Sequence, residues 1–186
     1  MSIPYLVIPP TLSRLLIPRL VLEQTRRALA GPGTNGFEAV VLWLGRVASP
    51  TDARVETAFR PRQITYRTPD GLAVEIPVEA WTTLALQLPP GRFVLTKVHT
   101  HPSAAYHSEA DAANPYLCHE GAIAITVPDF ARAPLTDLDH CSVNVLRGHH
   151  WIELTPPELR ATCFILPADT GADALPPDAP KTTHRK

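Results

Sequence analysis

The chain has 186 residues, is 45% hydrophobic and 19% charged, and carries a formal net charge of −1. This length and composition predict one domain with a sizeable core, and the near-zero charge argues against a nucleic-acid-binding surface. No apolar run reaches the about 18 residues of a membrane span, and the N-terminus lacks the basic-then-apolar order of a secretory signal. These features indicate a cytoplasmic protein that binds neither nucleic acid nor membrane.

The chain divides into a folded domain and two irregular ends. Residues 1–14 read as an extended N-terminal arm, and residues 15–167 as one domain. Residues 168–186 are Pro-rich and lack apolar periodicity, which predicts a disordered tail.

The first regular element is expected to be a helix. Its pattern begins at Pro18, a residue suited to a first helical position, and runs to about Ala30, where Gly31-Pro32-Gly33 is expected to stop it. The spacing predicts an inner face made of Leu20, Val21, Gln24, Ala28 and Leu29.

Strands dominate the rest of the chain. Residues 37–45 form a nearly continuous apolar run, expected at the buried centre of a sheet, and residues 54–59 should pair antiparallel with it. The remaining expected elements are a hairpin at 63–68 and 72–76, a helix at 77–88, strands at 92–98 and 122–127, a hairpin at 142–147 and 151–154, a helical turn at 156–160 and a strand at 163–166. This order predicts a mixed α/β (α+β) domain around one sheet.

The segment His99-Thr100-His101-Pro102 carries the strongest chemical signal. Because alternate side chains of a strand point to one face, His99 and His101 project together, and Pro102 is expected to end the strand. Asp111 follows in a short helix. Two imidazoles and one carboxylate make a three-ligand Zn²⁺ set with a fourth position for water, which is the pattern of a catalytic zinc site.

A zinc hydrolase also needs a base near the metal-bound water and a group for the oxyanion. Glu38 is the candidate base, because it is the one carboxylate at the head of an otherwise apolar strand. A buried, unpaired charge there would be costly without a function.

Each of these residues also has an ordinary structural interpretation. Ser108-x-x-Asp111 is close to a helix-capping pattern, in which the serine caps and the acidic residue answers it. His99 and His101 could form a plain polar face, and Glu38 could sit at the exposed start of its strand. Taken singly these alternatives stay open, whereas the joint occurrence of all the residues favours a metal site.

The combination of His99-x-His101-Pro102, about six intervening residues and Ser108-x-x-Asp111 resembles the JAMM motif of JAB/MPN-domain metalloproteases. The segment from Glu38 to Gly45 resembles the Glu-led first strand of that family, which usually ends in Leu-Gly. The resemblance covers roughly residues 15 to 155. It implies a single JAB/MPN-like domain of the bacterial stand-alone type, with a central mixed β-sheet flanked by helices in a cytidine-deaminase-like architecture.

The resemblance also implies roles for the site residues. His99, His101 and Asp111 would hold one Zn²⁺ with a bound water, Glu38 would take a proton from that water and pass it to the leaving amine, and Ser108 would hydrogen-bond the water or the developing oxyanion. The implied activity is that of a deubiquitinase-like isopeptidase, which cuts the peptide or isopeptide bond after the C-terminus of ubiquitin or a ubiquitin-like protein. The implied partners are that protein or its conjugate, with activating and conjugating enzymes encoded in the same operon.

One departure limits how far the substrate can be transferred. Only about ten residues separate Asp111 from the strand expected at 122–127, which leaves little room for the insertion that eukaryotic deubiquitinases of the family use to grip ubiquitin chains. Two alternatives are the same fold releasing an amino acid from a sulfur-carrier protein, and a non-catalytic MPN scaffold. The complete motif disfavours the scaffold.

The other chemistry-bearing residues favour ordinary roles. Cys118, Cys141 and Cys163 are odd in number and widely spaced, which predicts reduced thiols rather than a disulfide framework. His107 is expected to be a solvent-exposed loop residue, and Cys118-His119-Glu120 lacks a fourth metal ligand. The surface is expected to hold His140, His149 and His150. A zinc deaminase would need a Pro-Cys-x-x-Cys segment and a serine hydrolase a Gly-x-Ser-x-Gly elbow, and the sequence contains neither.

Overall fold

The computed structural model describes residues 13–68, 71–112, 117 and 119–167. The elements are β1 (Arg14–Pro18), α1 (Arg19–Gly33), β2 (Val40–Val47), β3 (Asp52–Phe59), β4 (Ile64–Thr68), β5 (Gly71–Glu75), α2 (Val78–Gln87), β6 (Phe93–Thr100), α3 (Glu109–Ala112), β7 (Ile123–Val127), the 3₁₀ turn η1 (Asp129–Ala131), β8 (Ser142–Arg147), β9 (His150–Glu153), α4 (Pro156–Thr162) and β10 (Cys163–Leu166). The mixed α/β class predicted from the sequence is confirmed.

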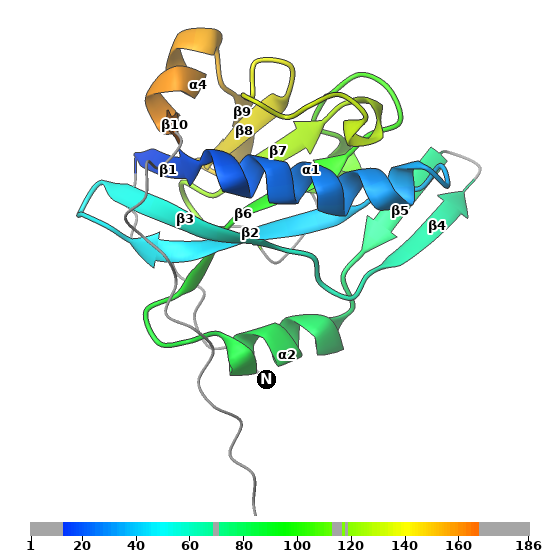
Figure 1. The fold of residues 1–186 in the computed structure, drawn as a ribbon, viewed down its shortest axis with the longest axis horizontal. Helices are drawn as coiled ribbons and strands as arrows, with labels where there is room; N and C mark the ends of the chain where they lie inside the picture. The colour runs from blue at the N-terminus through cyan, green and yellow to red at the C-terminus, as the bar shows by residue number, and fades with distance from the viewer. Residues whose placement is uncertain (1–12, 69–70, 113–116, 118, 168–186) are drawn as a thin grey trace, which may run out of the picture.

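Eight strands form one curled mixed sheet in the order β10-β1-β3-β2-β6-β7-β8-β9, and β4 pairs with β5 in a separate ribbon (Figure 1). Strand β6 lies in the middle, antiparallel to β2 and parallel to β7. Its residue His99 lies opposite Val40 on one side and Thr126 on the other. The end of β6 that carries His99 therefore lies near the centre of the sheet, and His101 follows directly after it.

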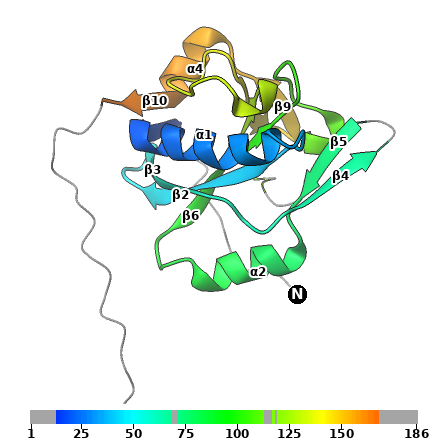
Figure 2. The ribbon, with the colours of Figure 1, turned by 45° about the vertical axis from the view of Figure 1, so that its right-hand side comes forward.

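Helices α1 and α2 lie on opposite faces of this sheet, as both views show (Figures 1 and 2). Under α1 lies the larger core, which includes Leu22, Trp43 and Val98. Under α2 lies a smaller core, in which Trp81 and Leu84 pack on Val40 and Leu42. Among the described residues, no helix is long and apolar enough to cross a membrane.

Helix α1 differs from its prediction in length and in its inner face. It continues through Gly31 and Pro32 to Gly33, because the Thr34 N–H still donates to the Ala30 carbonyl at 3.1 Å. The predicted inward residue Leu20 is 62% exposed, so that part of the prediction is wrong. The buried face is Val21, Leu22, Thr25 and Leu29.

Strand β1 was not predicted, since Leu15-Leu16-Ile17 formed only a short apolar run before the expected start of the helix at Pro18. It pairs in parallel with β3 and β10, which lie far along the chain, so no local signal could reveal it. Arg14, placed at the end of the expected arm, belongs to this strand. The rest of the arm, residues 1–12, and the expected tail, residues 168–186, lie outside the described residues.

Candidate metal centre

The face of β6 that looks toward α2 carries a row of buried polar side chains. Lys97 and His99 lie on this face of the strand, and His101 follows just beyond its end. Their exposed fractions are 7%, 2% and 5%, respectively. Thr100 points the other way, and its hydroxyl accepts a hydrogen bond from the Ala39 N–H at 3.0 Å. The predicted common orientation of the two histidines is therefore confirmed.

The segment after β6 is held by backbone hydrogen bonds to the segment after β7. The His101 N–H donates to the Val127 carbonyl at 3.0 Å, and the Phe130 N–H donates to the His101 carbonyl at 2.9 Å. In η1 the residues Asp129, Phe130 and Ala131 have φ of 51°, 53° and 55°, which is a strained conformation for residues with a side chain. A left-handed turn thus fixes the backbone of one candidate ligand, and nothing in the sequence indicated it.

Asp111 reaches the histidines from α3, and Ser108 positions it. The Ser108 hydroxyl donates to Asp111 Oδ2 at 2.7 Å, and the Ser108 N–H donates to the same oxygen at 3.2 Å. In return, the Asp111 N–H donates to the Ser108 hydroxyl at 3.1 Å. This is the reciprocal pattern of a capping box, so the structural alternative for this pair is present. The same bonds turn the carboxylate toward the histidines.

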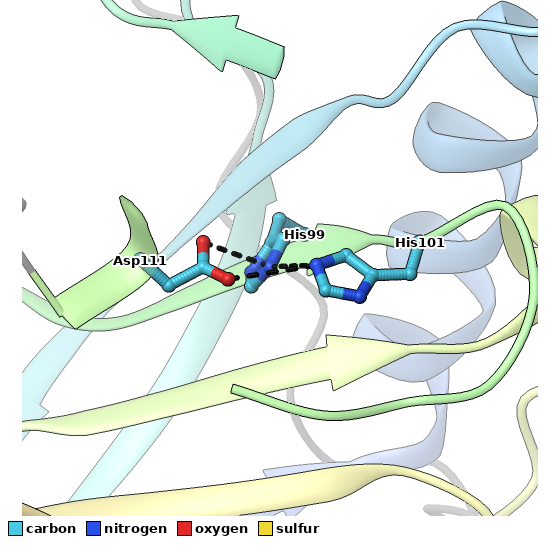
Figure 3. A group of neighbouring side chains, drawn as sticks. All are labelled: His99, His101 and Asp111. Atoms are coloured by element: carbon cyan, nitrogen blue, oxygen red, sulfur yellow. Dashed lines mark hydrogen bonds and ion pairs between the residues drawn. The ribbon is translucent and has the colours of Figure 1, made fainter. Parts of the chain in front are cut away.

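Figure 3 shows both imidazoles directed at the Asp111 carboxylate. The His99 Nε2 lies 3.0 Å from Asp111 Oδ1, and the His101 Nε2 lies 3.5 Å from Oδ2. The two Nε2 atoms are 3.3 Å apart. Tetrahedral coordination with Zn–N and Zn–O bonds of about 2.0 Å requires ligand atoms about 3.3 Å from each other. The three side chains therefore fit a metal of this size, as expected from the sequence.

Burial and the neighbouring groups shift the pKa values of Asp111 and His99. Burial alone would raise the pKa of Asp111, but hydrogen bonds from His101 and His99 and the charge of Lys97 hold it well below its usual range. Burial lowers the pKa of His99 to about 4. At neutral pH the group thus contains a carboxylate and a neutral His99 imidazole, which are the protonation states that metal binding requires.

Glu38 lies next to this group and is 8% exposed, so its alternative interpretation as the exposed start of a strand is wrong. It precedes the first residue of β2 by two positions. The adjacent Ala39 carbonyl accepts a hydrogen bond from the Thr100 N–H at 3.1 Å, which ties this segment to the end of β6. Burial raises the pKa of Glu38 to about 7, and His101 and Lys97 partly oppose that rise.

Lys97 was overlooked in the sequence. Its Nζ lies 3.2 Å from Asp111 Oδ1. It stands two positions before His99 in a strand, so the alternation that paired the histidines also places Lys97 on their face. Strand alternation could therefore have predicted the position of Lys97, but its mostly apolar neighbours in the strand gave no sign of a charged site.

The other chemistry-bearing residues are mixed in outcome. The prediction that His107 is solvent-exposed is wrong, because its half-buried ring packs 4.8 Å from the Trp151 ring and burial lowers its pKa. Cys141 and Cys163 are free thiols, as predicted, and burial raises the pKa of each to about 12. His140, His149 and His150 are exposed, as predicted. Cys118 lies outside the described residues.

Comparisons with known proteins give a curated relative and several solved structures of similar fold. No family model matches the chain. The probable metalloprotease y4jG of Sinorhizobium fredii is 34% identical over 119 residues, which cover 63% of this chain and 73% of that protein. Protein DSY2949 of Desulfitobacterium hafniense shares the fold, with a TM-score of 0.52 and 16% identity over 82% of this chain and 92% of that chain.

A JAB1/MPN domain protein from Archaeoglobus fulgidus is 17% identical to this chain, with a TM-score of 0.42. The matched region covers 74% of this chain and 94% of that chain. The relative of Sinorhizobium fredii is named a probable metalloprotease. In this chain the His-x-His-Pro and Ser-x-x-Asp segments meet in one compact cluster of His99, His101 and Asp111. At this identity and coverage, this chain belongs to the same family as that probable metalloprotease, and its motif segments resemble those of JAB/MPN-domain metalloproteases.

Proposed function

We propose that this metalloprotease uses Zn²⁺ to hydrolyse the peptide or isopeptide bond after the C-terminal tail of a ubiquitin-like protein, in deconjugation or in maturation of a precursor. The observation that carries the proposal is a buried carboxylate, Glu38, beside a compact set of three candidate ligands, His99, His101 and Asp111. A base next to a metal-binding group is the minimum apparatus of a metal-dependent hydrolase.

His99, His101 and Asp111 would hold the ion. Bound Zn²⁺ supplies Lewis acidity toward the scissile carbonyl and lowers the pKa of its bound water toward about 7. Asp111 is kept in position by its bonds to Ser108. The shared carboxylate and the anchored backbone of His101 pre-organise the ligands, which limits the reorganisation that binding requires.

Glu38 would accept a proton from the attacking water and return it to the leaving amine. Burial favours this exchange, since a carboxyl group with a pKa near the working pH both accepts and gives up a proton readily. We assign to Ser108 a hydrogen bond to the water or to the developing oxyanion, in addition to its bonds to Asp111.

The choice of a ubiquitin-like substrate rests on the resemblance of the motif to deubiquitinase-like members of the family. An extended tail could add to the edge of a sheet and satisfy its backbone groups there. Activating and conjugating enzymes from the same operon are the proposed partners. The free thiols Cys141 and Cys163 fit a reducing compartment, and we propose the cytoplasm.

The test is to mix the purified protein with a fusion of the ubiquitin-like protein encoded beside its gene and to identify the products by mass spectrometry. We expect one cut directly after the ubiquitin-like C-terminus, loss of the cut with a chelator, and recovery with added Zn²⁺. The variant Glu38→Gln should keep its fold and metal but cleave at least about 100-fold more slowly.

Three outcomes would contradict the proposal. Glu38→Gln cleaving as fast as the wild type would remove the base. Release of a single amino acid from a sulfur-carrier protein, with no cut of the fusion, would favour the small-substrate alternative. A protein that takes up no metal after dialysis against Zn²⁺ would be a scaffold.

A further inference from the structure

Lys97 is a buried cation whose neighbours across the sheet are apolar. In the sheet its backbone lies between Leu42 of β2 and Ala124 of β7, and Leu42 belongs to the core under α2. The side chain is 8% exposed, so its ammonium group is largely removed from water. A buried charge is strongly unfavourable without a partner, and the partner here is Asp111, at 3.2 Å.

The two oxygens of Asp111 have different neighbours. Oδ2 accepts hydrogen bonds from the hydroxyl and the N–H of Ser108. Oδ1 lies 3.0 Å from the His99 Nε2 and 3.2 Å from the Lys97 Nζ. The oxygen nearest to His99 is therefore the one that the ammonium group also contacts. A metal ion bound by His99 and Asp111 would therefore have to share the Asp111 carboxylate with the Lys97 ammonium group.

We propose that Lys97 is a positioning residue that competes with the metal for Asp111 and thereby weakens metal binding. The inference rests on the proposed metal ligands. Lys97 neutralises the single carboxylate of the ligand set, and it places a positive charge a few ångströms from a divalent cation. Both effects oppose metal binding, and repulsion at such a distance in a buried site is large enough to change an affinity by an order of magnitude or more.

The opposite expectation is that Lys97 helps the metal by orienting Asp111. The structure makes this contribution small, because Ser108 already orients the carboxylate through two hydrogen bonds of 2.7 and 3.2 Å. The Asp111 N–H closes the same capping arrangement on Ser108. Loss of Lys97 would therefore remove the competing charge and leave the ligand in place. The consequence of having Lys97 is a higher dissociation constant for the metal, so that the site fills only at a higher free metal concentration.

The experiment measures the Zn²⁺ dissociation constant by competition with a chromophoric chelator, using the full chain at one pH and one salt concentration. The neutral variants Lys97→Met and Lys97→Gln should bind Zn²⁺ at least about tenfold more tightly than the wild type. Lys97→Arg keeps the charge and should stay within about threefold of the wild type. The rise in melting temperature on adding Zn²⁺ should grow in step with the affinity, because a ligand of the native state stabilises it by mass action.

Arg46→Met is the matched control. It removes one cation from the neighbouring strand β2, where Arg46 forms an exposed ion pair with Glu56 at 3.0 Å, and it should leave Zn²⁺ binding unchanged. Lys97→Gln keeps a group that can donate to Asp111, so it remains informative if Lys97→Met folds poorly.

The outcomes separate this inference from the proposed function. If His99→Ala abolishes stoichiometric Zn²⁺ binding but both neutral variants bind no more tightly than the wild type, Lys97 does not compete, while the metal site stands. Tighter binding by Lys97→Arg as well would show that charge is not the cause. If the wild type itself takes up no Zn²⁺, the ligand assignment and the inference fail together.

Discussion

The two faces of the central strands treat buried polar groups differently. On the face under α1, the Trp43 Nε1 donates to the Thr25 hydroxyl at 2.8 Å, and that hydroxyl donates to the Val21 carbonyl at 2.7 Å. On the face under α2, the Nδ1 atoms of His99 and His101 find no hydrogen-bond partner among the described residues. Lys97 and Asp111 add opposite charges to this second face.

This difference between the two faces indicates that one mainly stabilises the fold and the other mainly serves function. Under α1 the Trp43 and Thr25 side chains complete each other's hydrogen bonds, which is what a core requires, although the buried Thr96 hydroxyl on this face finds no partner among the described residues. Under α2 the chain gathers polar and charged groups that cost free energy to bury, and of these the Nε2 atoms of the two histidines and the Asp111 carboxylate are the ones that a bound ion would use. Neighbouring residues of one strand should therefore respond in opposite ways to substitution.

The largest effect is expected from His99→Ala compared with Val98→Ala. His99→Ala removes a candidate ligand and should lower cleavage by at least about 1000-fold, with metal uptake lost. Val98 is fully buried on the α1 face, so Val98→Ala should cost about 2–3 kcal/mol of unfolding free energy yet keep metal stoichiometry and near-normal cleavage. Denaturant unfolding, metal analysis and a cleavage assay measure the three quantities.

This pair of variants tests which face of β6 carries the metal site. If Val98→Ala loses metal while His99→Ala loses only stability, the functional face has been assigned to the wrong side of β6.

The sequence predicted most of this arrangement, because its signals are local. The alternation of β6 placed His99 and His101 on one face, and the spacing from Ser108 to Asp111 placed a carboxylate in the first turn of α3. The burial of Glu38 could be argued from its place before an apolar strand. These inferences need only the period of a strand and the cost of a buried charge.

The features that the sequence did not reveal depend on residues far apart. The left-handed turn η1 is compatible with α1 because Gly33 lies beside it, and a Cβ on Gly33 would come within 2.5 Å of the Phe130 Cβ. Pairing of β1 with β3 and β10 likewise appears only when the sheet is assembled. His107 was expected in solvent, but β9 brings Trp151 against it.

A smaller effect is expected from the same substitution on each face, Thr25→Val and Thr126→Val. Thr25→Val leaves the Trp43 indole N–H buried without an acceptor and should cost about 1–3 kcal/mol. The Thr126 hydroxyl lies 3.4 Å from the His99 Nε2, which is long for a hydrogen bond, so Thr126→Val should cost less than about 1 kcal/mol. Denaturant unfolding of the chelator-treated proteins measures both. Equal costs would mean that the two faces do not differ in the way described.

A pH dependence sharpens the contrast at Glu38. Its pKa is about 7 in the folded protein, against 4.5 for an ordinary glutamate, because burial disfavours the carboxylate. The folded state therefore binds more protons than the unfolded state between these values. The stabilising contribution is fully present below pH 4.5 and is lost as the pH rises through 7.

Glu38→Gln removes this titration, so the melting temperature of the wild type relative to Glu38→Gln should fall from pH 4.5 to pH 7.5, by up to about 10 °C. The depressed pKa of His99 acts in the opposite direction, but it is present in both proteins and cancels in the difference. Both must be kept metal-free with a chelator, since a bound cation would lower the pKa of Glu38. A difference that stays constant over this range would mean that Glu38 titrates as it does in the unfolded chain, and burial would then not prepare it as the base.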